Sequence, residues 1–410
     1  MDQAAAVPSD SVLNHRPFVL FWFARSGTFM ARQVQTVAVG WQVYAITHSV
    51  LDLGLVGFVQ FLPQLLLTLV AGHAADRYDR RWVLCASQLV QALAAAALMW
   101  GTIGGWLSRD AIFALVFAIG IARAFEAPSL QAIVPTLVPV PLVGRAIALA
   151  SSASQAALVI GPALGGFVYA IGADVDYGLC VALWLVAAAL ATFARGRRTV
   201  GARARLNLET LFAGIAYIRA KPVILGAMSL DLFAVLLGGA TALLPVYARD
   251  ILMVGPWGLG LLRSAPAVGA IAMSLLLAYW TIERKAGWIM LGCVALFGVM
   301  TMVFALSTSF WLSLTALAVL GASDSISVVI RNSLVQLQTP DAMRGRVSAV
   351  HMLFVGTSNT LGEFESGVTA AWFGTVPAVL LGGIGTLLVV LIWLKLFPEL
   401  AKFERLAGGT

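Results

Sequence analysis

Two long apolar stretches without a charged residue flank a dense cluster of charges near the start of the chain. The stretches run from Leu53 to Ala71 and from Trp82 to Trp100, and the cluster between them runs from Gly72 to Arg81. An uncharged apolar stretch of about 20 residues is long enough to cross the hydrocarbon core of a bilayer as a helix. The pattern therefore predicts two membrane-spanning helices that are joined by a short charged hairpin.

The composition extends this prediction to the whole chain. Hydrophobic residues make up 60% of the 410 residues and charged residues only 11%, whereas a soluble domain carries about a quarter charged residues. The net charge of +7 suggests nucleic acid at first sight, but the basic residues lie in short loops between apolar stretches, as in membrane proteins. We therefore expect a lipid bilayer around the chain and no nucleic-acid partner.

The cysteines and histidines indicate neither a metal site nor a cofactor. Cys85, Cys180 and Cys293 are isolated in or beside apolar stretches, and the four histidines lack metal-ligand spacing. Such cysteines are usually small buried hydrophobic residues. The start of the chain, Met1 to Asn14, is polar, and the apolar stretch after it is too long for a signal-peptide core. We expect this first span to remain as an anchor.

The apolar stretches predict an all-α integral membrane protein with twelve transmembrane helices. The only long connection, residues 196–221, divides them six and six. This predicts an N-terminal six-helix bundle (1–195), a linker (196–221) and a pseudo-symmetric C-terminal six-helix bundle (222–410). The spans are expected at about 17–45, 51–75, 82–104, 110–136, 142–171, 178–195, 222–248, 257–281, 287–306, 309–337, 346–371 and 376–398.

The linker combines a basic stretch with an amphipathic pattern. Arginines are frequent between Arg195 and Arg205, and apolar residues then recur at helical spacing from Leu208 to Ile218. An amphipathic helix on the membrane surface, beside anionic headgroups, fits this pattern. A docking site for a regulatory partner is the alternative.

Charges alternate in sign from one predicted loop to the next. Basic residues dominate every second loop and both termini, and the loops between them are close to neutral or acidic. Because basic loops stay in the cytoplasm, both termini are expected there. The basic set is Arg16, Arg77, Arg80, Arg81, Arg145, Arg195 to Arg205, Arg284, Lys285, Arg344, Arg346, Lys402 and Arg405, and the other set is Asp52, Arg109, Asp110, Asp174, Asp176, Arg249 and Asp250.

Two motifs in the first half resemble those of the major facilitator superfamily. The hairpin reads Gly72-x-x-x-Asp76-Arg77-x-x-Arg80-Arg81, with Asp79 where the family usually has glycine. The segment Gly161-Pro162-Ala163-Leu164-Gly165-Gly166 is similar to the core of the fifth-span motif of drug and metabolite antiporters. The resemblance implies the major facilitator fold.

Three segments of the second half resemble one branch of that superfamily. They are Pro245 to Asp250, Arg344 to Ala349, and Asn359 to Gly367. The branch includes enterobactin-type siderophore exporters and proteins labelled transmembrane secretion effectors. Its fourth span often reads Ala-Pro-x-Arg, whereas this chain has Leu130 after Ala127-Pro128-Ser129.

Carboxylates within predicted spans are the candidates for proton coupling. Ionisable groups inside a membrane are costly and are usually functional or paired. A carboxyl group in apolar surroundings favours its neutral form, which suits a proton carrier. We rank Glu363 first, then Asp324, then Glu126. The alternative is permanent pairing with arginine, Glu126 with Arg123 or Arg32 and Asp324 with Arg331.

Other polar and aromatic residues within spans are candidates to line the substrate cavity. Asn359 lies one turn before Glu363 on the same helix face. The glutamines join helices in the alternative interpretation, and the aromatic residues belong to an interfacial belt. The cavity candidates are Arg32, Gln33, Trp41, Phe58, Gln60, Arg123, Gln155 and Asn359.

The resemblance implies a cytoplasmic gate at the hairpin. In the superfamily, the hairpin carboxylate and its arginines clasp neighbouring helices and stabilise the outward-facing state. Here these would be Asp76 with Arg77, Arg80 and Arg81, together with Gly72 of the same motif, and the expected partner is the start of span 11 near Arg346. A topology signal alone is the alternative. Close helix packing, at an interface between the halves, is expected at Gly161, Pro162, Gly165 and Gly166.

The leading hypothesis is a proton-coupled exporter (antiporter) of a small amphipathic molecule, such as a siderophore or drug, in a bacterial inner membrane. It would act by alternating access as a monomer. An importer or facilitator with the same fold is the first alternative, because fold does not decide direction. A membrane enzyme or assembly factor is the second, but the sequence contains no GxxxxGK, HExxH or GxSxG motif.

Overall fold

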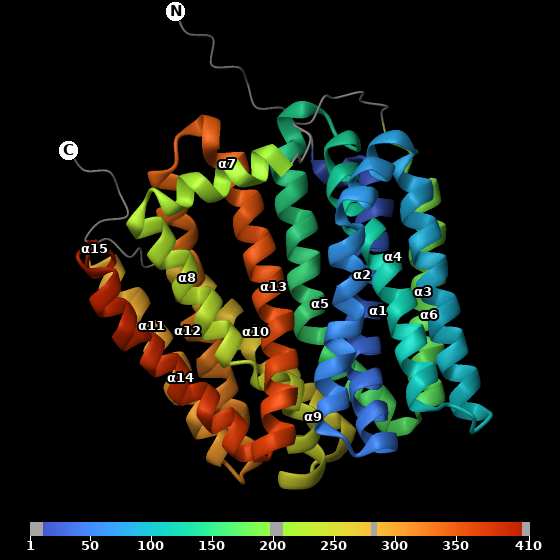
Figure 1. Cartoon of the computed structure of the whole chain (residues 1–410). Coiled ribbons are helices and arrows are strands. Elements are labelled where there is room, and N and C mark those ends of the chain that lie inside the picture. Colours follow the sequence, from blue (N-terminus) through green and yellow to red (C-terminus); the bar gives the residue numbers. More distant parts are fainter. Residues whose placement is uncertain (1–10, 197–207, 280–284, 404–410) are drawn as a thin grey trace, which may run out of the picture. The chain divides into compact units, whose positions relative to one another are not determined.

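A computed structural model describes residues 11–196, 208–279 and 285–403 of the chain, which are helical throughout with no strand among them (Figure 1). The first half contains η1 (Val12–Asn14), α1 (Arg16–Thr47), α2 (Val50–Arg77), α3 (Arg80–Ile103), α4 (Arg109–Ile133), η2 (Val134–Thr136), η3 (Val140–Leu142), α5 (Val143–Ile171) and α6 (Ala173–Phe193). The second half contains α7 (Leu208–Arg219), α8 (Pro222–Leu237), η4 (Ala240–Leu243), α9 (Leu244–Val246), η5 (Tyr247–Ile251), α10 (Gly255–Tyr279), α11 (Ala286–Leu306), α12 (Phe310–Gln338), α13 (Asp341–Phe373), α14 (Thr375–Leu396) and α15 (Pro398–Ala401).

The described helices confirm the prediction of a multi-pass, all-α membrane protein. Ten helical segments among them are long and apolar enough to cross a bilayer. Two further long helices, α1 with 32 residues and α13 with 33 residues, fall outside this set, and both carry charged side chains within their length, such as Arg25 and Arg32 in α1 and Glu363 and Glu365 in α13. Together the two groups are consistent with twelve spans.

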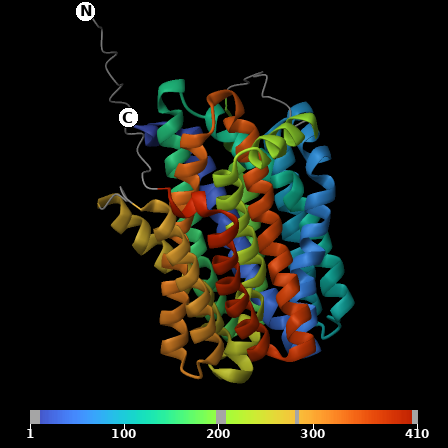
Figure 2. The same ribbon diagram turned by 60° about the vertical axis from the view of Figure 1, so that its left-hand side comes forward.

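Contacts divide the chain into two compact units, whose boundaries differ from the predicted halves at one place. The first unit comprises residues 1–42 and 59–204, and the second comprises residues 43–58 and 205–410. Residues 43–58, at the end of α1 and the start of α2, thus pack with the second unit. The long helices within each unit run side by side (Figures 1 and 2).

Small residues bring the helices of the first unit close together. The core beside α6 packs the fully buried Trp184 against Ala31, Ala92 and Ala95 of α1 and α3. A Cβ on Gly120 of α4 would lie only 2.3 Å from the Gln60 carbonyl oxygen of α2. Because the hydrophobic effect does not drive helices together within lipid, close van der Waals contacts of this kind contribute much of the stability of helix packing.

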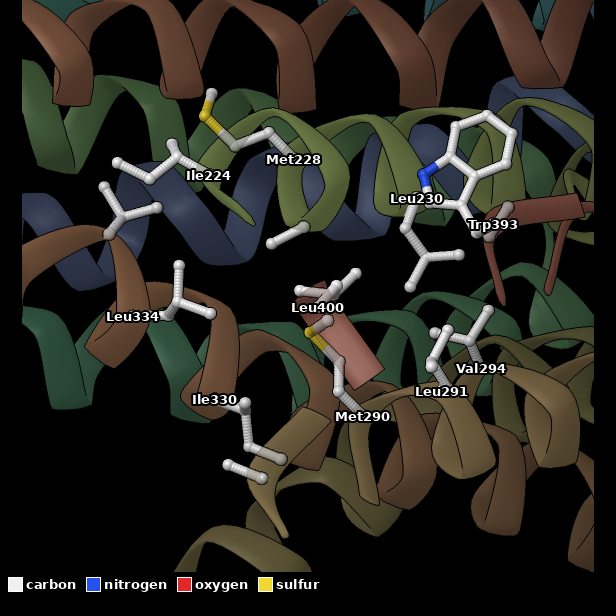
Figure 3. Packing of buried hydrophobic residues seen from close by; sticks show 14 of the residues in the cluster. Ile224, Met228, Leu230, Met290, Leu291, Val294, Ile330, Leu334, Trp393 and Leu400 are labelled. Atoms are coloured by element: carbon white, nitrogen blue, oxygen red, sulfur yellow. The ribbon is translucent and has the colours of Figure 1, made fainter. Parts of the chain in front are cut away.

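A larger apolar core holds the second unit together. Ile224 and Met228 of α8, Met290 of α11 and Ile330 of α12 meet in it, with Trp393 of α14 at one end (Figure 3). The Trp393 indole donates a hydrogen bond of 3.0 Å to the Gly226 carbonyl oxygen. This bond satisfies the one polar atom of a large buried side chain.

The predicted seventh span is not a continuous helix. The α-helix ends at Leu237, and the chain continues through η4 and α9 into the π-helical turn η5. The break falls at Gly238 and Gly239, where a Cβ on Gly239 would lie 2.4 Å from the Gly362 carbonyl oxygen. Only glycine permits this approach of α13 to non-helical backbone.

The structure moves several predicted loop residues into helices. Asp174 and Asp176 lie in the first turn of α6, which begins at Ala173 rather than near residue 178, and Asp176 is fully buried. Arg249 and Asp250 lie in η5. These shifts reflect the uncertainty of helix ends in sequence patterns. Arg284, Arg405 and the basic stretch of the linker after Gly196 lie outside the described residues.

Helix α7 follows the linker and packs against α12 and α13 within the second unit. A Cβ on Gly214 would lie 2.9 Å from the Arg346 carbonyl oxygen of α13, and the Tyr217 hydroxyl donates a 3.0 Å hydrogen bond to the Gln338 carbonyl oxygen. The predicted amphipathic segment therefore forms a helix that is joined to α12 and α13.

Candidate functional site

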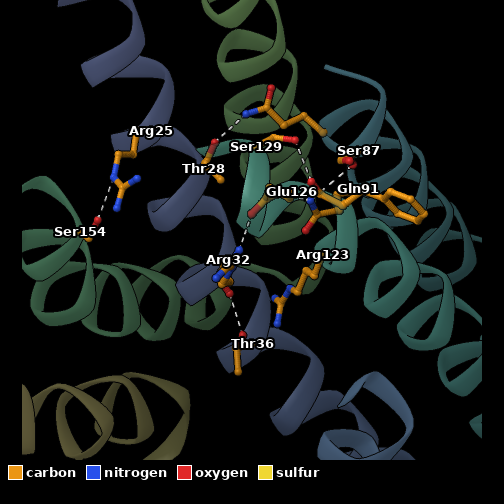
Figure 4. A network of polar contacts seen from close by, with 12 residues as sticks. Arg25, Thr28, Arg32, Thr36, Ser87, Gln91, Arg123, Glu126, Ser129 and Ser154 are labelled. Carbon is orange, nitrogen blue, oxygen red and sulfur yellow. Dashed lines mark hydrogen bonds and ion pairs between the residues drawn. The ribbon is translucent and has the colours of Figure 1, made fainter. Parts of the chain in front are cut away.

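A polar cluster in the first unit is centred on Glu126 of α4 (Figure 4). Its carboxylate is fully buried. Arg32 of α1 forms an ion pair with Oε1, and the Gln91 amide of α3 donates a hydrogen bond to Oε2. Three helices thus converge on one carboxylate, as one of the two pairings considered for Glu126 predicts.

Gln91 was not among the predicted site residues, although the sequence carries a signal for it. Ser87, Gln88 and Gln91 are fully or almost fully buried in α3. They recur at helical spacing within an otherwise apolar span, so they lie near one another on the helix. Gln88 donates a 2.8 Å hydrogen bond to Thr28 of α1. A polar stripe within a span predicts interhelical hydrogen bonds.

Arginines extend this cluster along α1 and α4. Arg123 donates a 2.6 Å hydrogen bond to the Gln60 side chain of α2. Arg25 donates from Nε to the Ala150 carbonyl oxygen and to the Ser154 hydroxyl of α5, each at 3.2 Å. The guanidinium groups of Arg25 and Arg32 lie 5.0 and 5.2 Å from the centre of the Phe29 ring. The structure therefore places Arg32 and Arg123 in one polar region, together with Arg25.

The remaining cavity candidates of the first unit are dispersed. Gln33 and Trp41 are half-buried in α1, and Gln155 is exposed in α5. The Gln33 side chain lies against α5, because a Cβ on Gly161 would be 2.5 Å from its Cβ. Their role at a substrate site stays a prediction.

The second unit buries a different ion pair from the one considered for Arg331. Arg331 of α12 pairs with Asp231 of α8 rather than with Asp324 of its own helix, and the two paired side chains are 3% and 9% exposed. The reason is spacing: Asp324 and Arg331 are two helical turns apart, whereas α8 brings Asp231 beside the guanidinium.

Asp324 lines a small pocket together with Asp231, Val294, Phe297 and Ser327. Within the part of the chain that the structure describes, its carboxylate makes no ion pair and accepts no hydrogen bond. A carboxyl group in such a site can exchange a proton without first breaking a salt bridge.

The side chain of Glu363 in α13 lies next to Gly57 of α2. A Cβ on Gly57 would lie 2.9 Å from Glu363 Oε2. The charge of Arg263 in α10 acts on Glu363, yet no salt bridge joins them among the described residues. Sequence reasoning missed Arg263, because it lies on another helix.

Glycines bring α2 and α13 into contact beside Glu363. A Cβ on Gly54 would lie 3.0 Å from the Cα of Gly367. The rings of Phe58 and Phe364 stack nearby with centroids 4.9 Å apart, which gives Phe58 a neighbour within the protein. Asn359 is exposed, and its amide bonds to the Val355 carbonyl oxygen at 2.8 Å.

A second contact joins residues 43–58 to η5. The Tyr44 hydroxyl donates a hydrogen bond to Asp250. Arg249 donates a 3.4 Å bond to the Tyr44 carbonyl oxygen and lies 5.7 Å from the centre of its ring. This group, which sequence reasoning did not predict, sits on the π-helical turn, a feature that often marks functional segments.

The hairpin residues lie at the junction of α2 and α3. Asp79 caps α3 by accepting a 3.0 Å hydrogen bond from the Arg81 backbone and pairs with its guanidinium at 2.7 Å. Arg80 donates to the Ala132 carbonyl oxygen of α4 at 3.4 Å. Asp79, at the usual glycine position, thus has a capping role.

The other predicted gate residues are placed by the backbone alone or are exposed. Gly72, Asp76 and Arg77 lie in the last turns of α2, and the Asp76 side chain lies outside the described residues. Arg346 is exposed in α13. The latch between Asp76 and Arg346 therefore stays a prediction.

The fifth-span motif packs against α1 of the same unit. A Cβ on Gly165 would lie 2.9 Å from the Cα of Val34, and Gly161 approaches Gln33 as described above. Pro162 and Gly166 are buried within α5. The close helix contact is thus observed with α1, and an interface between the halves at this motif stays a prediction.

Comparison with protein families and known proteins places this geometry in context. Residues 9–407 match the family described as transmembrane secretion effectors. The enterobactin exporter EntS of Citrobacter koseri is 25% identical over 392 residues, which cover 95% of this chain and 94% of the relative. EntS of Salmonella typhimurium is 25% identical over 393 residues, with the same coverage.

Solved structures share the fold at low sequence identity. A bacterial homologue of the lysosomal transporter Spinster, inward-facing and occupied, aligns with a TM-score of 0.75 at 13% identity and covers 96% of this chain and 98% of its own. A bacterial homologue of the iron transporter ferroportin aligns with a TM-score of 0.69 at 18% identity, covering 96% and 100%. These likenesses confirm the predicted major facilitator fold.

Proposed function

Because the chain belongs to the transmembrane secretion effector family of major facilitator transporters, we propose that it is a proton-coupled exporter of a small amphipathic molecule. The family establishes a membrane transporter rather than an enzyme. Relatives named enterobactin exporters support outward transport and a siderophore-like or drug-like substrate. The proposed mechanism is alternating access, by a monomer in a bacterial inner membrane with both termini in the cytoplasm.

The observation that carries proton coupling is the contrast among three carboxylates. Glu126 has both oxygens engaged, by Arg32 and Gln91. Asp324 and Glu363, in contrast, accept no hydrogen bond from any residue that the structure describes. A carboxylate whose oxygens are bound by a guanidinium and an amide must break these contacts to bind a proton, whereas one that accepts no hydrogen bond need not. We therefore assign the coupling role to Asp324 and Glu363 and a structural role to Glu126.

The position of Glu363 offers a way to link protonation to helix movement. Its carboxylate lies under Gly57 of α2, next to the contact of Gly54 with Gly367. Movement of α2 away from α13 would uncover the carboxylate, and closure would cover it. Proton binding at Glu363 would thus depend on the separation of these two helices.

Transport in liposomes tests the proposal. The purified full chain is reconstituted in liposomes that contain pyranine to report the internal pH, and proton movement is measured while rhodamine 123, fluorescein or a catecholate siderophore is supplied as substrate. We expect proton movement with at least one compound in the wild-type protein, and its loss in the Asp324→Asn, Glu363→Gln double variant. The matched control is Asp110→Asn, since this carboxylate is 89% exposed at the start of α4.

Two outcomes would contradict the proposal. Full proton coupling in the double variant would remove Asp324 and Glu363 from the mechanism. Substrate uptake that runs down its own gradient without any proton movement would instead favour a facilitator with the same fold.

A further inference from the structure

Arg25, Phe29 and Arg32 form one face of α1 with an excess of positive charge. Their spacing of four and three residues places them on the same side of the helix, and both guanidinium groups lie about 5 Å from the Phe29 ring. Each of the three side chains is half-buried. The face is therefore accessible from outside the packed core of the first unit.

The positive charge of this face is only partly balanced. Arg32 pairs with Glu126, whose second oxygen is already occupied by Gln91. The partners of Arg25 are a backbone carbonyl oxygen and a hydroxyl group, both uncharged. No carboxylate pairs with Arg25 in residues 11–196, 208–279 or 285–403. A guanidinium within a membrane span that lacks a counter-ion is costly, and such groups commonly serve a ligand.

The hydrogen bonds of Arg25 leave its outer edge available. Both bonds use Nε, and they fix the side chain against Ala150 and Ser154 of α5. Nη1 and Nη2 donate to no group in the described part of the protein, and neither is a buried atom without a partner. A guanidinium held in this way presents parallel N–H donors, which match the two oxygens of a carboxylate.

From this geometry we propose that Arg25, next to Arg32, binds an anionic oxygen group of the transported molecule, such as a carboxylate. Arg25 makes the direct contact, and Phe29 and Ser154 hold its guanidinium in place. Since the face already has one carboxylate for two arginines, one negative charge on the ligand neutralises it. The inference rests on the proposed transport function and gives that function a substrate class: small molecules with at least one acidic group.

Two dyes of similar shape and opposite charge test this assignment. Binding of fluorescein, which is anionic, and rhodamine 123, a methyl ester that is cationic and has no free carboxylate, is measured by fluorescence anisotropy on the full chain in phosphatidylcholine nanodiscs. We expect fluorescein to bind more tightly. Arg25→Gln should weaken fluorescein binding about tenfold or more, because a hydrogen-bonded charge contact is lost. Arg25→Lys keeps the charge but loses the parallel N–H donors, so its affinity for fluorescein should lie between those of the wild type and Arg25→Gln.

The chain offers a matched control in Arg109→Gln. Arg109 also lies over an aromatic ring one helical turn away, 4.7 Å from the centre of Phe113, but it is 46% exposed and its neighbour Asp110 lies 3.4 Å away. Its substitution should leave fluorescein binding unchanged. Unchanged thermal unfolding of the Arg25 variants shows that they fold.

Several results would overturn the assignment. These are the absence of fluorescein binding, equal or tighter binding of rhodamine 123, and wild-type affinity in Arg25→Gln. A loss of fluorescein binding when phosphatidylglycerol replaces phosphatidylcholine would show that the site takes a lipid headgroup instead. Proton-driven transport of rhodamine 123 without binding of fluorescein would refute this inference alone, whereas Arg25-dependent binding without any proton movement would refute the proposed coupling alone.

Discussion

The buried ion pair between Asp231 and Arg331 gives a quantitative prediction about the second unit. Asp231→Asn removes one charge and almost no volume. The Arg331 guanidinium then stays in a site where its side chain is only 3% exposed, and its Nε already lacks a hydrogen-bond partner among the described residues. Breaking a buried pair costs about 3–5 kcal/mol. The lower end applies here, because the amide oxygen of asparagine still accepts a hydrogen bond.

Thermal unfolding of the purified protein, followed by tryptophan fluorescence, measures this cost. A loss of about 3 kcal/mol in a unit of this size corresponds to a fall in Tm of about 6–12 °C. Asp341→Asn is the matched control: Asp341 also pairs with an arginine, Arg344, at 2.7 Å, but the two side chains are 87% and 52% exposed. An exposed pair contributes about 0–1 kcal/mol, so this variant should unfold close to the wild-type temperature.

Asp324 offers a second carboxylate near Arg331 in this experiment, because it lines the same pocket as Asp231. If Asp324 replaces the lost charge in Asp231→Asn, the double variant Asp231→Asn, Asp324→Asn should be the one that shows the full loss. Equal Tm values for the wild type, the single variant and the double variant would refute the reasoning.

Further predictions concern Glu126, Gly321 of α12 and Gly292 of α11. Glu126→Gln should lower the free energy of unfolding by about 1–3 kcal/mol, because one of the two bound donors loses its acceptor. Asp324→Asn breaks no hydrogen bond, so its free energy of unfolding should lie within about 0.5 kcal/mol of the wild-type value. Equal losses in the two variants would contradict the assignment of a structural role to Glu126 and a coupling role to Asp324. Gly321→Ala should destabilise by about 1–3 kcal/mol, because its Cβ would lie 1.9 Å from the Pro266 carbonyl oxygen. Gly292→Ala in α11 is the control, because no atom lies within 4 Å of the new Cβ. A Tm for Gly321→Ala as high as that of Gly292→Ala would show that α10 and α12 do not pack as closely as described.

Local patterns predicted the helices well, but they did not predict which polar groups meet. Helix ends failed where a span begins with acidic residues, as at Asp174 and Asp176, because charge was interpreted as loop. The sequence did not predict the break in the seventh span, because Gly238-Gly239 lies inside an apolar run. The periodicity of hydrophobic residues does not reveal where the backbone leaves the helical conformation. The partners of Arg331 and Glu126 lie on neighbouring helices. The sequence alone is compatible with several pairings of these residues, because it does not specify which helices are neighbours.

The sequence by itself determined the membrane environment, the helical fold and the family, because the bilayer forces every backbone polar group into helical hydrogen bonds and so makes length and apolarity sufficient signals. The tertiary structure alone decided that Glu126 is engaged at both oxygens, that Asp231 takes the arginine considered for Asp324, and that Glu363 lies under Gly57. Which charge is neutralised, and which is left for a proton or a substrate, depends on distances of a few ångströms between different helices, and the spacing of residues along one helix does not contain them.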